Sequence, residues 1–264
     1  MREDDAVQPA RDAITAFIRS CENIVIFTGA GISTEAGVPD FRSPGSPWLV
    51  HKPVPFQEYM ASGEARIEAW RRKFAMDDIY RHLGPGATHR FIAEGVAQGH
   101  VSAVVTQNID NLHQRSGIPD HQIIELHGNG SYAHCLYCDR RHEIPEIRIH
   151  FERYGYPPVC DDCGGIVKSA TISFGQKLPT EALRRAREAM IRADGIIVLG
   201  SSLVVRPAAD LPILAAEAGA RLLIVNREKT PLDSAADYVI RGDLPGVLPE
   251  LWPLTDMNAS STSR

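Results

Sequence analysis

Short apolar runs alternate with longer amphipathic stretches over most of the chain. The runs are continuously apolar, which is typical of strands buried on both faces of a parallel sheet. The stretches between them carry apolar residues at helical spacing, as Ile14, Phe17 and Ile18 do near the N-terminus. We predict strands at 23–28, 102–106, 122–126, 195–199 and 221–225, and helices at 10–20, 89–98, 180–192 and 208–218. This order predicts a doubly wound α/β fold.

Two segments interrupt the alternation. Residues 54–83 carry Glu, Arg and aromatic residues at helical spacing, and residues 135–163 are bounded by two pairs of cysteines. We expect both to belong to a smaller inserted domain, and the polar tail 257–264 to be disordered. The expected larger domain comprises 1–51, 88–134 and 168–256, and the smaller one comprises 52–87 and 135–167.

Composition excludes several classes of protein. Of the 264 residues, 44% are hydrophobic and 23% are charged, which excludes collagen-like, coiled-coil and largely disordered chains. A net charge of -5 argues against nucleic acid as a direct partner. No apolar run approaches the ~20 residues of a membrane helix, and the acidic N-terminus does not resemble a signal peptide. We therefore expect a cytoplasmic protein that does not bind membranes.

Four of the five cysteines form two Cys-x-x-Cys pairs, Cys135 with Cys138 and Cys160 with Cys163. This spacing is close to that of four-cysteine zinc modules, in which the metal has no vacant position and serves structure. The alternatives are two disulfides or four unrelated thiols, which suit a reducing compartment less well. His134 and His142 are nearby in the sequence, but four cysteines already complete a ligand set. Cys21 is expected to be a small buried apolar residue.

A glycine turn follows the first predicted strand. Gly29, Ala30, Gly31 and Ser33 could bring backbone N–H groups close to a pyrophosphate. The usual dinucleotide fingerprint has a third glycine where Thr34 stands, and the acidic residue expected ~20 positions later is missing. An ordinary dehydrogenase site therefore fits badly, and a simple tight turn is the alternative.

The segment after this turn is charged and aromatic. Asp40, Phe41 and Arg42 follow Gly37-Val38-Pro39, at a place where a phosphate turn usually continues into a long helix. We expect this loop to close over a ligand. Taken alone, Asp40 and Arg42 could equally be a surface ion pair of little energetic weight.

Polar residues cluster after the other predicted strands, where open α/β sheets bind ligands. Asn108 and Asp110 offer an amide and a carboxylate that suit a carboxamide such as nicotinamide, although a polar helix cap is a common alternative. His127 could act as a general base, whereas a lone histidine is usually structural. The remaining strand-end candidates, for phosphate and ribose, are Gly200, Ser201, Ser202 and Asn226.

Together, these motifs closely resemble the sirtuin family, and they occur in the family's order from about residue 14 to 251. The resemblance implies a Rossmann-like sheet domain, a smaller domain with helices and a four-cysteine zinc module, and NAD⁺ bound between them. It implies that Gly29, Ala30 and Gly31 line the phosphates, that Ser33 also binds the cofactor, and that Asp40, Phe41 and Arg42 belong to a mobile cofactor loop. It places Gln107, Asn108, Ile109 and Asp110 on the nicotinamide side, and Gly200, Ser201, Ser202, Asn226 and Leu244 on the adenosine side.

The implied reaction is NAD⁺-dependent removal of acyl groups, with acetyl expected, from lysines of protein or peptide substrates. Nicotinamide, an O-acyl-ADP-ribose and free lysine would be the products. His127 would be the general base, and Asn108 would be a second catalytic residue. We expect a monomer.

Two departures from the family pattern concern the substrate. This chain has Phe174-Gly175-Gln176 where Phe-Gly-Glu is common, and Lys168-Ser169-Ala170-Thr171 lacks a frequent proline. Relatives that favour succinyl or malonyl groups carry Tyr-x-x-Arg, whereas the nearest match here is Trp70-x-x-Lys73, so the resemblance does not support an acidic acyl group. Residues 174–178 are expected to pair with the substrate backbone as a strand, with residues 203–206 opposite them.

Two other functions are compatible with part of this pattern. Mono-ADP-ribosyl transfer to proteins would cleave the same glycosidic bond. A non-catalytic module that binds zinc and NAD⁺ is disfavoured by the joint presence of His127 and Asn108-Ile109-Asp110.

Overall fold

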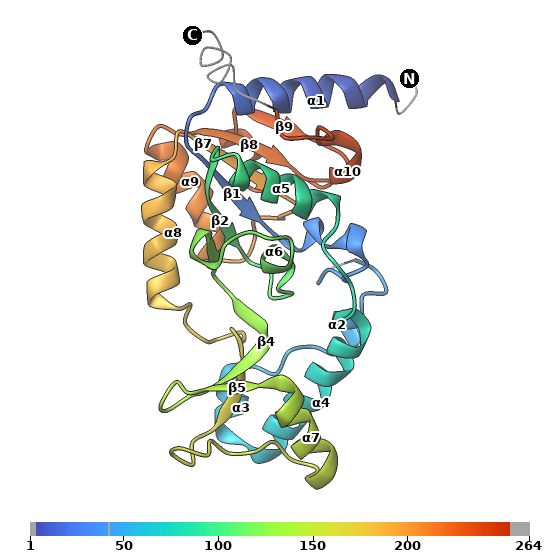
Figure 1. Ribbon diagram of the computed structural model, residues 1–264, viewed down its shortest axis with the longest axis vertical. Coiled ribbons are helices and arrows are strands. Elements are labelled where there is room, and N and C mark those ends of the chain that lie inside the picture. The colour runs from blue at the N-terminus through green and yellow to red at the C-terminus, as the bar shows by residue number, and fades with distance from the viewer. Residues whose placement is uncertain (1–3, 42, 254–264) are drawn as a thin grey trace, which may run out of the picture.

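The computed structural model describes residues 4–41 and 43–253. Its larger part is built on a parallel six-stranded sheet in the order β3-β2-β1-β7-β8-β9 (Figure 1). The strands are β1 Ile24–Thr28, β2 Val101–Thr106, β3 Ile123–Glu125, β7 Gly195–Leu199, β8 Arg221–Val225 and β9 Tyr238–Ile240. Five of them were predicted to within one residue at each end, which confirms the doubly wound sheet. The three-residue strand β9 was not predicted, because it is a half-exposed edge strand whose apolar run is only three residues long.

The chain leaves β1 for β2 and β3 on one side and later returns to β7 on the other. Neighbouring strands end at the same level, because Thr28 pairs with both Thr106 and Leu199, and Leu199 pairs with Val225. The carboxyl ends of β1, β2, β7 and β8 therefore meet at a switch point of the sheet, where open α/β proteins bind ligands.

Helices cover both faces of this sheet. One face is packed by α1 Asp4–Arg19, α5 Ala87–Ala97 and α10 Leu244–Val247, and the other by α8 Thr180–Arg192 and α9 Leu211–Glu217 (Figure 1). Helix α8 has the predicted bounds. The predicted helix 208–218 is divided into a 3-10 turn, Ala208–Asp210, and α9. Pro212 accounts for the new start, since proline lacks an N–H and fits the first turn of a helix.

The smaller part lies beyond the carboxyl ends of the parallel strands (Figure 1). It contains α3 Phe56–Ala61, α4 Gly63–Tyr80, α7 Ile144–Tyr154 and an antiparallel sheet of β5 Arg141–Glu143, β4 Gly128–Cys135 and β6 Val167–Thr171. Its core includes Trp70, Phe74, Ala133, Ile147 and Val167. Helical structure was predicted for residues 54–83, which contain α3 and α4, but α7 and this antiparallel sheet were not predicted.

The remaining short elements are α2 Pro47–Val50, α6 Leu112–Arg115 and the 3-10 turns Ala30–Ile32, Thr34–Ala36, Asp120–Gln122 and Asp233–Ala235. Throughout residues 4–41 and 43–253, every helix is too short or too polar to cross a membrane. The tail 257–264, which was expected to be disordered, lies outside the described residues.

Candidate active site

A cavity of about 1390 Å³ lies where the two parts of the molecule meet. Its walls come from the carboxyl ends of β1, β2, β7 and β8, from the loop after β1, and from α3, α4 and β6. The predicted residues that line it are Gly29, Ala30, Gly31, Ser33, Asp40, Phe41, Gln107, Asn108, Ile109, Asp110, His127, Gly200, Ser201, Ser202 and Asn226. Leu244 is not among the lining residues, because it begins α10 and is buried in the core under the sheet. Arg42 lies outside the described residues.

The two glycine turns after β1 and β7 pack backbone against backbone. The Gly31 N–H donates to the Gly200 carbonyl at 2.9 Å. A Cβ atom at Gly29 would lie 2.7 Å from the Gly200 oxygen, and one at Gly31 would lie 2.8 Å from the Gly200 Cα. Gly200 itself has a φ of +59°. Side chains are therefore sterically excluded from this junction, which exposes backbone groups to the cavity.

A hydrogen-bonded group stands beside these turns. Asn108 Nδ2 donates to Ser33 Oγ at 3.2 Å, and the Ser33 hydroxyl donates to Asp110 Oδ2 at 2.7 Å. The other carboxylate oxygen of Asp110 accepts the N–H of Leu112, the first residue of α6, at 3.0 Å. Asp110 thus bonds the first N–H of α6 with one oxygen, although the N-cap residue itself is Asn111, while the second oxygen joins the cavity group. The amide and carboxylate are held in fixed orientations.

His89 lies behind this group and was missed in the sequence. It is fully buried, with Nε2 3.4 Å from Ser33 Oγ, and its Nδ1 accepts the Gly86 N–H at 3.2 Å. That acceptor role leaves the proton on Nε2, so Ser33 Oγ can accept from His89 while it donates to Asp110. Burial lowers the pKa of His89, which favours this neutral form. His89 begins a predicted helix, and no local pattern in the sequence indicates its contact with Ser33.

His127 connects the two sheets, since it follows β3 and immediately precedes β4. Its Nδ1 lies 3.1 Å from the Gln107 carbonyl oxygen, which selects the tautomer with the proton on Nδ1 and a free lone pair on Nε2. Burial lowers the pKa of His127, although the hydrogen bond to Gln107 acts in the opposite direction. The imidazole is therefore neutral at neutral pH and can accept a proton.

Gln107 and Ser201 join the β2 and β7 ends. Gln107 Nε2 donates to Ser201 Oγ at 2.8 Å, and this oxygen also accepts the Leu203 N–H at 3.3 Å. The carbonyl of Gln107 orients His127, and its side chain binds Ser201. Gln107 therefore links the imidazole to the turn that follows β7.

The loop after β1 folds over one wall of the cavity. Asp40 accepts the N–H and the hydroxyl of Ser43 at 2.7 and 2.6 Å. Phe41 stacks on Trp48, with ring centroids 4.5 Å apart and an interplanar angle of 17°. Trp48 Nε1 in turn donates to the Pro39 carbonyl at 3.1 Å. Trp48 also lines the cavity and was not predicted.

The wall formed by the smaller part is aromatic and basic. Tyr59 donates to the Val167 carbonyl at 2.7 Å and accepts from Trp70 Nε1 at 3.1 Å. Lys73 forms a partly buried ion pair with Asp77, and Lys168 also lines the cavity. Lys168 was named in the sequence only for the missing proline beside it.

The predicted channel segments lie at the same cavity but are not strands. Phe174, Lys177 and Leu178 line one part of it, as do Val205 and Arg206. The Phe174 carbonyl accepts the Phe56 N–H at 2.9 Å, so this backbone is anchored to α3 in the structure. Pairing with a substrate backbone stays a prediction.

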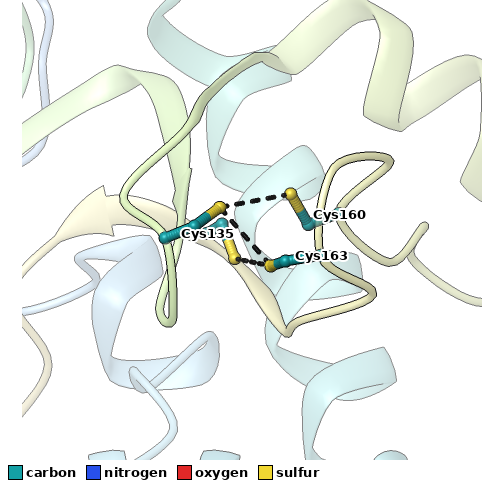
Figure 2. Close-up of side chains that lie close together, drawn as sticks. Cys135, Cys160 and Cys163 are labelled. Carbon is teal, nitrogen blue, oxygen red and sulfur yellow. Dashed lines mark hydrogen bonds between the residues drawn. The ribbon is translucent and has the colours of Figure 1, made fainter.

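The four paired cysteines converge at the base of the smaller part, and Figure 2 shows Cys160 and Cys163 on one loop facing Cys135. The Sγ–Sγ distances are 3.4 Å for Cys135–Cys163, 3.6 Å for Cys138–Cys160 and 3.4 Å for Cys138–Cys163. A disulfide requires about 2.05 Å, so the disulfide alternative is wrong for this structure. Four sulfurs at 2.3 Å from a tetrahedral zinc lie about 3.8 Å apart, so the cluster fits that ion. His134 instead contacts Asp139 at 2.6 Å.

The fold and cavity define an open α/β protein with a ligand site at the switch point of its sheet. The family model of the Sir2 family matches residues 29–207. The chain therefore belongs to the Sir2 family, the sirtuins.

Curated relatives are similar over most of their length. An NAD-dependent protein deacetylase of Rhodopseudomonas palustris is 52% identical over 227 residues, covering 86% of this chain and 90% of the relative. NAD-dependent protein deacetylase 1 of Bradyrhizobium diazoefficiens is 50% identical, covering 86% of this chain and 89% of the relative. Among solved structures, "Sir2-p53 peptide-NAD+" has a TM-score of 0.78 and 36% identity, covering 89% of this chain and 93% of that one.

Proposed function

We propose that this protein is an NAD⁺-dependent protein-lysine deacylase. The observation that carries the proposal is one cavity that holds both glycine turns, the Asn108–Asp110 pair and a neutral His127. Relatives named as NAD-dependent protein deacetylases support it, as does a similar structure described as Sir2Tm bound to a propionylated peptide, at 35% identity and a TM-score of 0.77.

The residues divide into three roles. In the proposal, the diphosphate and adenosine side of NAD⁺ is held by Gly29, Ala30, Gly31, Gly200, Ser201, Ser202 and Asn226. The loop that covers it contains Asp40, Phe41 and Arg42. The nicotinamide side is held by Ser33, Gln107, Asn108, Ile109 and Asp110. Leu244 stays a prediction for adenine contact, although in this structure it is buried outside the cavity.

When bound, NAD⁺ supplies a glycosidic bond whose cleavage releases nicotinamide and lets the acyl carbonyl oxygen of lysine bond to C1′ of the ribose. The fixed amide of Asn108 and carboxylate of Asp110 orient the carboxamide of the leaving group. In this proposal His127 Nε2 would take a proton from a ribose hydroxyl, and that hydroxyl oxygen would bond to the acyl carbon as its bond to the lysine nitrogen breaks. One water molecule would then add to the acyl carbon and free the oxygen at C1′, which gives O-acyl-ADP-ribose and free lysine. Positioning supplies most of the acceleration because an amide oxygen is a poor nucleophile.

We further propose that Cys135, Cys138, Cys160 and Cys163 hold a structural zinc ion. Four thiolates leave no position for water, so this ion would stabilise the smaller domain rather than take part in the reaction. The division into domains at 1–51, 88–134 and 168–256 against 52–87 and 135–167 belongs to this proposal, and so does a monomeric state. A cluster of thiols that binds metal suits a reducing compartment, which favours the cytoplasm.

The test is turnover of an acetyl-lysine peptide with NAD⁺, followed by nicotinamide release and by the mass of the peptide. We expect both nicotinamide and the deacetylated peptide, with no signal from the same peptide carrying free lysine. The proposal fails if acetyl, propionyl and butyryl peptides all remain intact. An added ADP-ribosyl mass on protein acceptors, without loss of acyl groups, would instead support ADP-ribosyl transfer.

A further inference from the structure

Lys168 is a buried cation in the wall of the cavity. It lies on β6, its residue is 4% exposed, and it lines the cavity. Its Nζ donates to the Thr171 carbonyl at 2.5 Å and to the Ser169 carbonyl at 3.3 Å. The same atom lies 5.9 Å from the centre of the Tyr59 ring. The contacts therefore involve neutral groups alone, and no carboxylate of the described chain lies within ion-pair distance.

Other basic residues at this cavity are in a different situation. Lys73 and Arg72 are paired with Asp77 and Glu68 on their own helix, α4. Lys52 and Lys177 are exposed to water, which screens their charge. Lys168 thus combines burial with the lack of an acidic partner within residues 4–41 and 43–253.

This arrangement leaves part of the ammonium group without a partner. An ammonium has three N–H donors, of which two are accounted for by carbonyl groups. Burial lowers the pKa of Lys168 to about 8, so the side chain is still mainly charged at neutral pH. An anion that enters the cavity would satisfy the third donor and neutralise a desolvated charge, an interaction much stronger than one at the surface.

We propose that Lys168 marks an anion subsite at the end of the cavity formed by the smaller domain, and that the subsite binds a carboxylate of the acylated substrate. The carboxylate is either the end of a dicarboxylic acyl chain, such as succinyl, or an acidic side chain near the acylated lysine. The inference rests on the proposed deacylase function. It also revises the expectation from Trp70-x-x-Lys73, because Asp77 already neutralises Lys73 on α4 and the available charge comes from Lys168 on β6.

The first arm of the test compares succinyl-lysine with succinamoyl-lysine in one peptide, because these groups differ in charge but hardly in shape. We expect kcat/KM for nicotinamide release to be at least tenfold higher for succinyl, about 1.4 kcal/mol. Lys168→Met should abolish that preference and Lys168→Arg should retain part of it. Lys52→Met, which removes an exposed lysine from the same cavity, should change the ratio less than twofold.

The second arm compares acetyl-lysine peptides that carry Glu or Gln beside the acetyl-lysine. A preference for Glu that disappears in Lys168→Met assigns the carboxylate to the peptide side chain. Equal rates within both pairs of substrates in the unmodified protein overturn the subsite, whether or not the variants fold. If none of the acylated peptides in either arm, succinyl-lysine included, releases nicotinamide, the proposed function itself fails, so the two failures are distinguishable.

Discussion

The reactivity expected of His127 comes from two neighbours that the chain places around one ring. Burial removes water from the imidazole, and the Gln107 carbonyl fixes the proton on Nδ1. Burial favours the neutral ring at neutral pH, and the Gln107 carbonyl selects the tautomer with the lone pair on Nε2, although that hydrogen bond by itself raises the pKa. The ring therefore needs no second charged residue to prepare it.

The pH dependence of turnover tests this state. The neutral imidazole is the active form and burial lowers its pKa, so activity should be constant near neutral pH and should fall on acidification. The midpoint of that acidic fall in kcat/KM should lie below the ordinary histidine value of about 6.5. A midpoint above this value would contradict the buried, neutral base. His127→Ala should lose the acidic limb and ~10²–10⁴-fold of the rate, while NAD⁺ binding is kept.

Gly31 is a residue at which steric fit is decisive. In Gly31→Ala the new Cβ would lie 2.8 Å from the Gly200 Cα and oxygen, which are backbone atoms and cannot rotate away. We expect a loss of about 1–3 kcal/mol in the free energy of unfolding, measured with urea, and weaker NAD⁺ binding. Gly84→Ala is the matched control, because no atom lies within 4 Å of its added Cβ. Equal stability of the two variants would contradict the close packing of the turns.

At the scale of elements, the cysteine cluster joins two loops at one end of the paired strands β4 and β6. Cys135 ends β4, while Cys160 and Cys163 lie on the loop that leads into β6. The core of this part is small and includes Cys135 and Cys160 themselves. A metal that joins the two segments would thus contribute directly to folding of the smaller part.

Removal of zinc should therefore lower thermal stability and activity together. We expect a chelator to reduce Tm by roughly 2–4 °C for each kcal/mol lost, and Cys160→Ser to behave like the chelated protein. Added zinc should restore the unmodified protein but not the variant. Full activity in protein shown by metal analysis to lack zinc would contradict a structural role.

At the scale of the whole molecule, the cavity is shared between the parallel sheet and the smaller part. Gly31 and Ser201 come from the first, and Tyr59 and Lys168 come from the second. A ligand that fills this space contacts both parts at once, so its binding should stabilise the chain as a unit.

NAD⁺ should accordingly raise Tm in a concentration-dependent way. At 100 times its Kd a ligand adds about 2.7 kcal/mol, which corresponds to roughly 5–11 °C for a chain of this size. Differential scanning fluorimetry measures the shift, and ADP-ribose serves as a comparison ligand that lacks only the nicotinamide. If saturating NAD⁺ leaves Tm unchanged, the cavity is not its binding site.

Several elements followed directly from local patterns. The strand 195–199 and the helix 180–192 have the predicted bounds, because a continuous apolar run and an amphipathic repeat each report burial of the residues that carry them. The residues after the parallel strands were likewise predicted to share a site, and the strand register brings them to one cavity. Short strands such as β9, and β4 with its bulge, lack a repeat long enough to be recognised.

The sequence by itself determined the family, the parallel sheet, the cysteine cluster and the set of polar residues at strand ends, because each depends on spacing within short segments. Only the tertiary structure decided that His89 supports Ser33, that Trp48 stacks on Phe41, that Leu244 is buried, and that Lys168 lacks an acidic partner among the described residues. These features depend on contacts between separate segments or on burial by them, and Ser33 and His89 are 56 residues apart. No local pattern carries that information.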